Sequence, residues 1–232
     1  MRVVGTFLLV IVLVNAAGLV AYFSVAESDP LRDFLVDEDR LIESLSAAVF
    51  FLAFLGGAVL LVRGVRRRFD RRWLMLVTSL GLLGFLDELS YGERIFGLKM
   101  PKIAKIKLDA AHDVIDWLYY EGPLVVARHR GLCLLGLVAA IVLISFGLIR
   151  LRHRLWDLAC DRGNYPLYAL LAFFVAFLAC AVTIDLGILD PWSTDLPIVE
   201  ELLELSAAIA LVFSAYTVYR DRGEVMIRDD GA

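Results

Sequence analysis

The sequence predicts an all-α fold, a polytopic membrane bundle of about six transmembrane helices. The chain has 232 residues, of which 60% are hydrophobic and 22% are charged, and its mean hydropathy is +0.74. Soluble domains are about 45–50% apolar, so we expect the excess to face lipid. Six apolar runs of about 20 residues match the length that a helix needs to cross a bilayer. This composition excludes a soluble enzyme, a nucleic-acid-binding domain and a disordered protein.

The six predicted spans form one membrane domain over residues 1–232, because no polar segment is long enough to hold a separate globular domain. The first apolar run follows Arg2. It is longer than the apolar core of a secretory signal, about 7–15 residues, so we interpret it as an uncleaved span. The spans are expected at residues 4–25, 41–62, 73–89, 131–149, 166–184 and 197–218.

Positive charge predicts the orientation of these spans. The two ends of the chain and the links after the second and fourth spans carry 14 of the 23 Lys and Arg residues but only 7 of the 27 acidic residues. Because Lys and Arg concentrate in cytoplasmic loops, we expect a plasma-membrane protein with both termini in the cytoplasm. The lipid bilayer is the expected partner, and six spans also suit a homo-oligomer or a complex with another membrane protein.

The longest link, residues 90–130, is then expected on the outer side of the membrane. Lys alternates with apolar residues between positions 98 and 108, which suits a segment in the headgroup layer with snorkelling Lys side chains. Residues 109–120 predict a short amphipathic helix, which Trp117 and two adjacent tyrosines would anchor at the interface. This link is the amphipathic interfacial segment of the predicted fold.

Small residues four positions apart predict where the spans pack closely. They lie at Ala53 and Gly57, at Ala172, Ala176 and Cys180, and at Ser206, Ala210 and Ser214. The sequence Leu-Ser-Ala-Ala at 45–48 recurs at 205–208 in two spans that run in the same direction, unlike the inverted repeats of many transporters. Asn15, inside the first span, is expected to make a packing hydrogen bond.

Acidic residues gather near the outer ends of four spans. Asp87 and Glu88 stand about 14–15 residues into the third span, roughly 21–22 Å from its inner end and within the outer leaflet. Glu204 lies one turn deeper than Glu200 on the same helix face. The candidate polar cluster, with one arginine as a counter-ion, comprises Glu43, Asp87, Glu88, Arg94, Asp185, Glu200, Glu201 and Glu204.

Carboxylates at membrane depth are costly without partners, and three kinds of partner stay open. Arg40, Arg94 and the loop lysines would make a structural ion-pair network. A divalent metal bound by Glu88 and Glu204, with His112 from the outer loop as a nitrogen ligand, would make a metal site. Without either, some carboxylates would stay protonated, as they do in proton relays.

The end of the third span carries the most specific pattern in the chain. Residues 87–97 read Asp-Glu-Leu-Ser-Tyr-Gly-Glu-Arg-Ile-Phe-Gly. This stretch resembles the signature E-E-I-S-W-G-Q-R-I-F-G of a family of uncharacterised polytopic bacterial membrane proteins. The acidic start of the second span at Glu43, the loop stretch ending in His112 and the acid-rich last span around Glu200 are similar to that family as well. Among the departures, Glu93 in place of Gln adds a charge. The resemblance implies which residues to watch and no activity.

Three functions follow from these alternatives. The favoured one is a structural or accessory membrane component with a buried polar network. The second is a metal-dependent intramembrane hydrolase or transferase acting on lipid, for which the chain lacks an H-E-x-x-H pattern and a second well-placed histidine. The third is a cation- or proton-coupled transporter, for which it lacks an acid near the midplane. Whether the chain is an enzyme stays open at this level.

Overall fold

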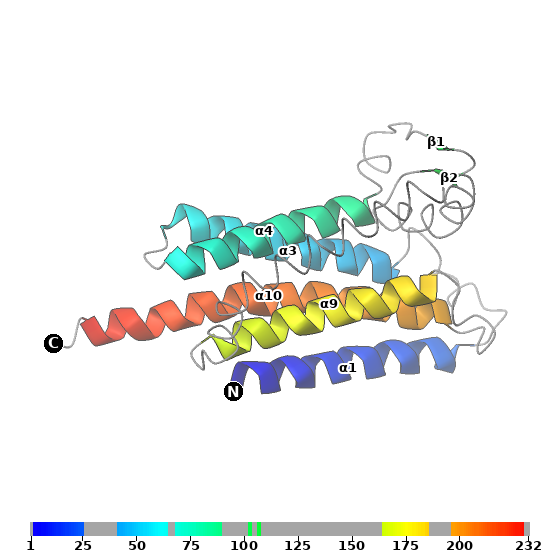
Figure 1. Cartoon of the computed structure of the whole chain (residues 1–232). Helices are drawn as coiled ribbons and strands as arrows, with labels where there is room; N and C mark the ends of the chain where they lie inside the picture. Colours follow the sequence, from blue (N-terminus) through cyan, green and yellow to red (C-terminus); the bar gives the residue numbers. More distant parts are fainter. Residues whose placement is uncertain are drawn as a thin grey trace, which may run out of the picture. The chain divides into compact units, whose positions relative to one another are not determined.

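The computed structural model describes residues 2–25, 41–64, 68–89, 102–103, 106–107, 164–185 and 196–229. Within these residues the fold is helical apart from one short pair of strands (Figure 1). The helices are α1 (Arg2–Ser24), α3 (Leu41–Val62), α4 (Arg68–Glu88), α9 (Tyr165–Asp185) and α10 (Leu196–Asp229), and the strands are β1 (Lys102–Ile103) and β2 (Ile106–Lys107). The predicted fourth span, residues 131–149, lies outside the described residues.

The chain divides into two compact units. They comprise Met1–Lys99 with Pro166–Ala232, and Met100–Tyr165. In the second unit β1 pairs antiparallel with β2, with Lys102 opposite Lys107 and Ile103 opposite Ile106. The alternation of Lys and apolar residues therefore takes the form of a hairpin there. The predicted amphipathic helix at 109–120 lies outside the described residues.

Three of the described helices, α1, α3 and α9, are long and apolar enough to cross a membrane. The exposed faces of these helices are apolar, like the faces that pack against other helices. On α1, for example, Leu9, Val12 and Val20 are 59–68% exposed. A continuous apolar surface of this kind would promote aggregation in water, whereas lipid accommodates it. Helices α4 and α10 carry charged residues near both ends, which shortens their uninterrupted apolar length.

Two helices extend beyond the predicted spans. α4 begins at Arg68 rather than near residue 73, and α10 continues to Asp229, well past residue 218. The hydrophobic runs mark the part of a helix that suits lipid, but charged residues such as Arg and Glu also form helices readily. Each helix therefore continues past the point where hydropathy falls. By contrast α3 stops at Val62, and Gly64 follows with a φ of 77°, a backbone conformation that glycine adopts without steric cost.

The helices of the first unit run alongside one another (Figure 1). α3 packs extensively against α4 and against α10, while α1 lies on α10. Phe7 of α1 joins the other helices through ring contacts with Phe173 of α9, at 5.4 Å between centroids, and with Phe213 of α10, at 5.6 Å. Trp73 of α4 meets Tyr168 of α9 edge to face at 5.7 Å. Aromatic contacts thus join α9 to α1 and to α4.

The predicted small-residue faces have different outcomes. Those of α3 and α10 are buried: Ala53 is fully enclosed, Gly57 packs against the Thr78 side chain, and Ser206 and Ala210 are also fully enclosed. The prediction for α9 is wrong within the described residues, where its small-residue face is exposed. That face consists of Ala172, Ala176 and Cys180. α9 instead buries larger side chains on another face, so its packing is set by shape rather than by close backbone approach.

Candidate functional site

Glu88, the last residue of α4, is the centre of the candidate site. It is one of the few charged side chains with little exposure, at 8%. Four other carboxylates repel the carboxylate of Glu88. The strongest repulsion comes from Glu204, followed by Glu43, Glu201 and Asp87. We call these five residues the carboxylate cluster. They come from α3 and α4, which are close together in the sequence, and from α10, which follows much later.

The antiparallel packing of α3 and α4 brings the first two parts of the cluster together. Gly81 of α4 lies against the backbone of Phe54, and one turn later Gly84 lies against the ring of Phe50. Because the two helices run in opposite directions, the next turn of α4 places Glu88 at the level of Ser46, one turn from Glu43. The absence of side chains at the two glycines lets the backbones approach at this end of the pair.

Ser46 contributes a polar group at the same level. Its side chain is fully buried, and its hydroxyl oxygen makes no hydrogen bond within the described residues. In an apolar environment a hydroxyl without a partner is costly. A buried hydroxyl group therefore stands on α3 one turn from Glu43 of the carboxylate cluster.

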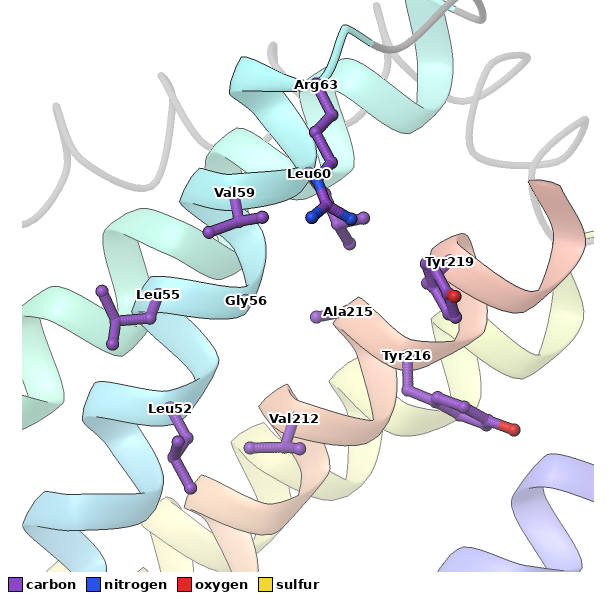
Figure 2. Close-up of a pocket in the computed structure, with 10 residues that line it drawn as sticks. All are labelled: Leu52, Leu55, Gly56, Val59, Leu60, Arg63, Val212, Ala215, Tyr216 and Tyr219. Atoms are coloured by element: carbon purple, nitrogen blue, oxygen red, sulfur yellow. The ribbon is translucent and has the colours of Figure 1, made fainter. Parts of the chain in front are cut away.

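The parallel packing of α3 and α10 adds the third part. Leu52 lies level with Val212, and Gly56 with Ala215, along one side of this helix pair (Figure 2). Counting back by equal steps along both helices brings the two Leu-Ser-Ala-Ala sequences, 45–48 and 205–208, level with each other. The serines and alanines of both are buried, except Ala48, which is exposed. The repeat thus fixes the register that carries Glu201 and Glu204 to the level of Glu43.

A hydrogen bond from α1 supports this arrangement. Asn15 Nδ2 donates to Ser206 Oγ at 2.9 Å and to the Ile11 carbonyl at 2.9 Å. The Ser206 hydroxyl in turn donates to the Leu202 carbonyl at 2.7 Å. The predicted packing role of Asn15 is confirmed. Gly18, one turn further along α1, lies against the Leu202 side chain. α1 therefore packs against the part of α10 that carries Glu201 and Glu204.

Comparison of the chain with protein-family models, curated proteins and solved structures finds no match. No relative therefore indicates a function for the carboxylate cluster.

The remaining predicted site residues are distributed as follows. Asp185 ends α9 and Glu200 stands in the first turns of α10, but among the described residues neither belongs to the set whose charges act on Glu88. Asp185 Oδ2 is buried without a hydrogen-bond partner in the described part of the chain. Arg94 and His112 lie outside the described residues.

Charge is separated along the helices. The described cations of α1, α3, α4 and α10 stand at the end opposite to the cluster, because they open α1 and α4 and close α3 and α10. These residues include Arg2, Arg63, Arg68, Arg71, Arg72 and Arg220. Over the described ranges, no group of three or more His, Cys, Asp or Glu side chains is arranged to hold a metal ion.

Proposed function

We propose that this chain is a six-span membrane protein with both termini in the cytoplasm and a structural or accessory role, in which the carboxylate cluster is the centre of a buried polar network. The position of Glu88 carries the proposal. Its side chain has little exposure, and carboxylates from three helices act on it. Like charges repel, so carboxylates at this depth are costly in lipid unless protons or a counter-ion neutralise part of their charge. A counter-ion shared by the carboxylates would hold their three helices together.

Such a network selects one arrangement of helices. In lipid, apolar side chains gain little by leaving the hydrocarbon for one another, so hydrophobic burial does not decide which helices pair. Polar groups do decide it, because a helix that left the network would take its carboxylates away from the counter-ion that neutralises them in a medium of low dielectric. The cluster acts at the outer ends of α3, α4 and α10, where it would fix both their pairing and their register.

Arg94 is the counter-ion that we assign to the network. It lies six residues after Glu88 in the sequence and follows Gly92, where a chain can turn at low steric cost. An arginine that folds back over Glu88 would form a charge-assisted hydrogen bond, which is about twice as strong as a neutral one. This pairing accounts for an acidic residue at the very end of an apolar helix.

A double-mutant cycle tests the pair. Glu88→Gln, Arg94→Gln and the double variant would be unfolded in mixed micelles, with Arg72→Gln as the control because Arg72 is exposed at the opposite end of α4. Each single change at the pair is expected to lower the free energy of unfolding, and the double variant to lose less than their sum, by about 0.5–3 kcal/mol. Strictly additive losses would refute the pairing.

Metal analysis separates the network from a metal site. The proposal predicts no stoichiometric transition metal in the detergent-purified wild-type protein or in Glu88→Gln. One metal ion per chain in the wild type, lost in Glu88→Gln, would instead favour the site with Glu88, Glu204 and His112. That outcome would justify assays for hydrolysis of lipid esters, amides and phosphates.

A further inference from the structure

A groove between α3 and α10 lies at the end of the bundle opposite to the carboxylate cluster (Figure 2). It is an open groove with a volume of about 410 Å³. Its walls are almost wholly apolar, and its lining residues are Leu52, Leu55, Gly56, Val59, Leu60, Arg63, Val212, Ala215, Tyr216 and Tyr219. The size and lining suit part of a long apolar ligand rather than a compact polar one.

The hollow arises from small residues between larger ones. A Cβ atom at Gly56 would meet no other atom within 4 Å, so the space above this glycine is open. Ala215, across from it on α10, is 5% exposed and forms part of the floor. Leu52 and Val59 on one side and Tyr216 on the other are 46–58% exposed and form the rims. In lipid, these rims face the hydrocarbon.

One end of the groove is charged. Arg63 directly follows α3, and in Figure 2 its side chain extends past Leu60 toward the space between the two helices. Tyr219, on α10, stands across the groove from it. An exposed arginine with tyrosines beside it is typical of the boundary between hydrocarbon and headgroups. The groove is therefore amphipathic along its length, apolar for about three helical turns and cationic at its end.

We propose that this groove binds an anionic phospholipid, with an acyl chain lying between α3 and α10 and the phosphate held by Arg63. The charge of Arg63 selects an anionic headgroup, and the guanidinium can hold phosphate oxygens with two parallel hydrogen bonds. A helix of a second copy would cover the apolar walls but would leave this charge without a counter-ion. The inference rests on the proposed membrane position, and the proposed orientation places the lipid in the cytoplasmic leaflet.

Native mass spectrometry of the full chain in detergent tests the proposal. The probe is an equimolar mixture of phosphatidylglycerol and phosphatidylcholine with identical acyl chains. Wild-type protein is expected to retain phosphatidylglycerol preferentially. Arg63→Gln should reduce that preference about fivefold, the effect of one cationic side chain at an anionic membrane surface, whereas Arg63→Lys should keep most of it. Arg72→Gln, at the same end but outside the groove, should leave it unchanged.

Filling the groove provides the second arm. Gly56→Leu places a side chain in the open space and should reduce retention of both lipids. Gly5→Leu is the matched control, because a Cβ atom at Gly5 also meets nothing within 4 Å but lies on α1, away from the groove. Thermal unfolding of both variants would show that they fold alike.

Three outcomes would overturn the proposal. They are equal retention of the two lipids by the wild type, unchanged retention in Gly56→Leu, and a change of oligomeric state in Gly56→Leu without any change in bound lipid. The last would assign the groove to a second copy of the chain. Excess glycerol 3-phosphate should not displace the lipid, and displacement would reassign Arg63 to a free phosphate. None of these variants touches the carboxylate cluster, so a failure here leaves the network proposal to its own test.

Discussion

Replacing Gly81 with alanine tests the close approach of α3 and α4 that places Glu88 beside Glu43. A Cβ atom at Gly81 would lie 2.7 Å from the backbone nitrogen of Phe54 and 3.0 Å from the carbonyl oxygen of Phe50. Ordinary contacts to carbon fall at about 3.5–4.0 Å, so the helices would have to separate by several tenths of an ångström. Backbone atoms cannot rotate out of the way as a side chain can.

The expected magnitude follows from two opposing effects. Forcing an extra methyl group into a packed interior costs about 1–3 kcal/mol. Alanine also favours the helix over glycine by about 0.5–1 kcal/mol. Gly56→Ala gains the second effect without the first, because its new Cβ atom meets nothing within 4 Å. We therefore expect Gly81→Ala to be less stable than Gly56→Ala by about 1–3 kcal/mol.

Gly84 sharpens the test because its obstacle is a side chain. A Cβ atom there would lie 2.6 Å from two carbons of the Phe50 ring. Gly84→Ala should thus be destabilised, and adding Phe50→Leu should recover part of the loss, whereas Phe50→Leu should not rescue Gly81→Ala. Reversible unfolding in mixed micelles, followed by circular dichroism, measures each variant. Equal stability of Gly81→Ala and Gly56→Ala, or rescue of both variants by Phe50→Leu, would refute the described contact between α3 and α4.

Three further predictions concern other contacts and the topology. A double-mutant cycle of Asn15→Val and Ser206→Ala should give a coupling of about 0.6 kcal/mol in unfolding free energy, as is typical of hydrogen bonds between membrane helices; a coupling of zero would contradict the bond. Tyr168→Leu should lose about 1–3 kcal/mol in the same assay, because it removes edge contacts with both Phe69 and Trp73, and a loss no greater than that of Tyr165→Leu on the exposed first turn of α9 would contradict it. Reporters fused to either terminus should be active only in the cytoplasm, and a periplasmic signal from either one would overturn the proposed orientation.

Hydropathy was sufficient to predict α1, α3 and α9 almost residue for residue, since an apolar run is itself the property that makes a segment span lipid. It failed at the start of α4 and at the end of α10, because helix formation continues through Arg and Glu residues that lipid excludes. The hairpin at β1 and β2 was also not predicted. Alternating Lys and apolar residues there suited a segment in the headgroup layer, and nothing in the pattern specified that the segment folds back on itself.

The sequence indicates the level of each acid along its helix but not the direction in which the acid faces. Counting residues along a span places Glu88 level with Glu43 and Glu204, and the charges of those two residues act on Glu88 in the structure. The same count also grouped Asp185 and Glu200, which do not belong to the set that acts on Glu88 within the described residues. Which acids meet depends on how each helix is turned, and that is decided by contacts such as those of the α4 glycines.

Adjacent glycines show why the groove could not be predicted. Gly56 and Gly57 differ by one position, which turns them about 100° apart around α3. Gly57 packs against Thr78, while Gly56 faces open space above Ala215. The four-residue spacing from Ala53 predicts that Gly57 packs closely, but nothing in the sequence indicates that Gly56 leaves a hollow. That open space becomes evident only once the neighbours of α3 are known.

α3 and α10 therefore contribute to both candidate sites, by opposite uses of small residues. In the first half of α3 and α10, the repeated Leu-Ser-Ala-Ala sequences bury their serines and most of their alanines. The acids of the preceding turns are brought together there. At the other half, Gly56 and Ala215 stand between larger residues that keep the surfaces apart, so a hollow remains beside Arg63. Because the two helices are parallel and in register, a change that rotates one against the other would disturb the carboxylate cluster and the groove together. A change that only fills the hollow, such as Gly56→Leu, would leave the cluster intact.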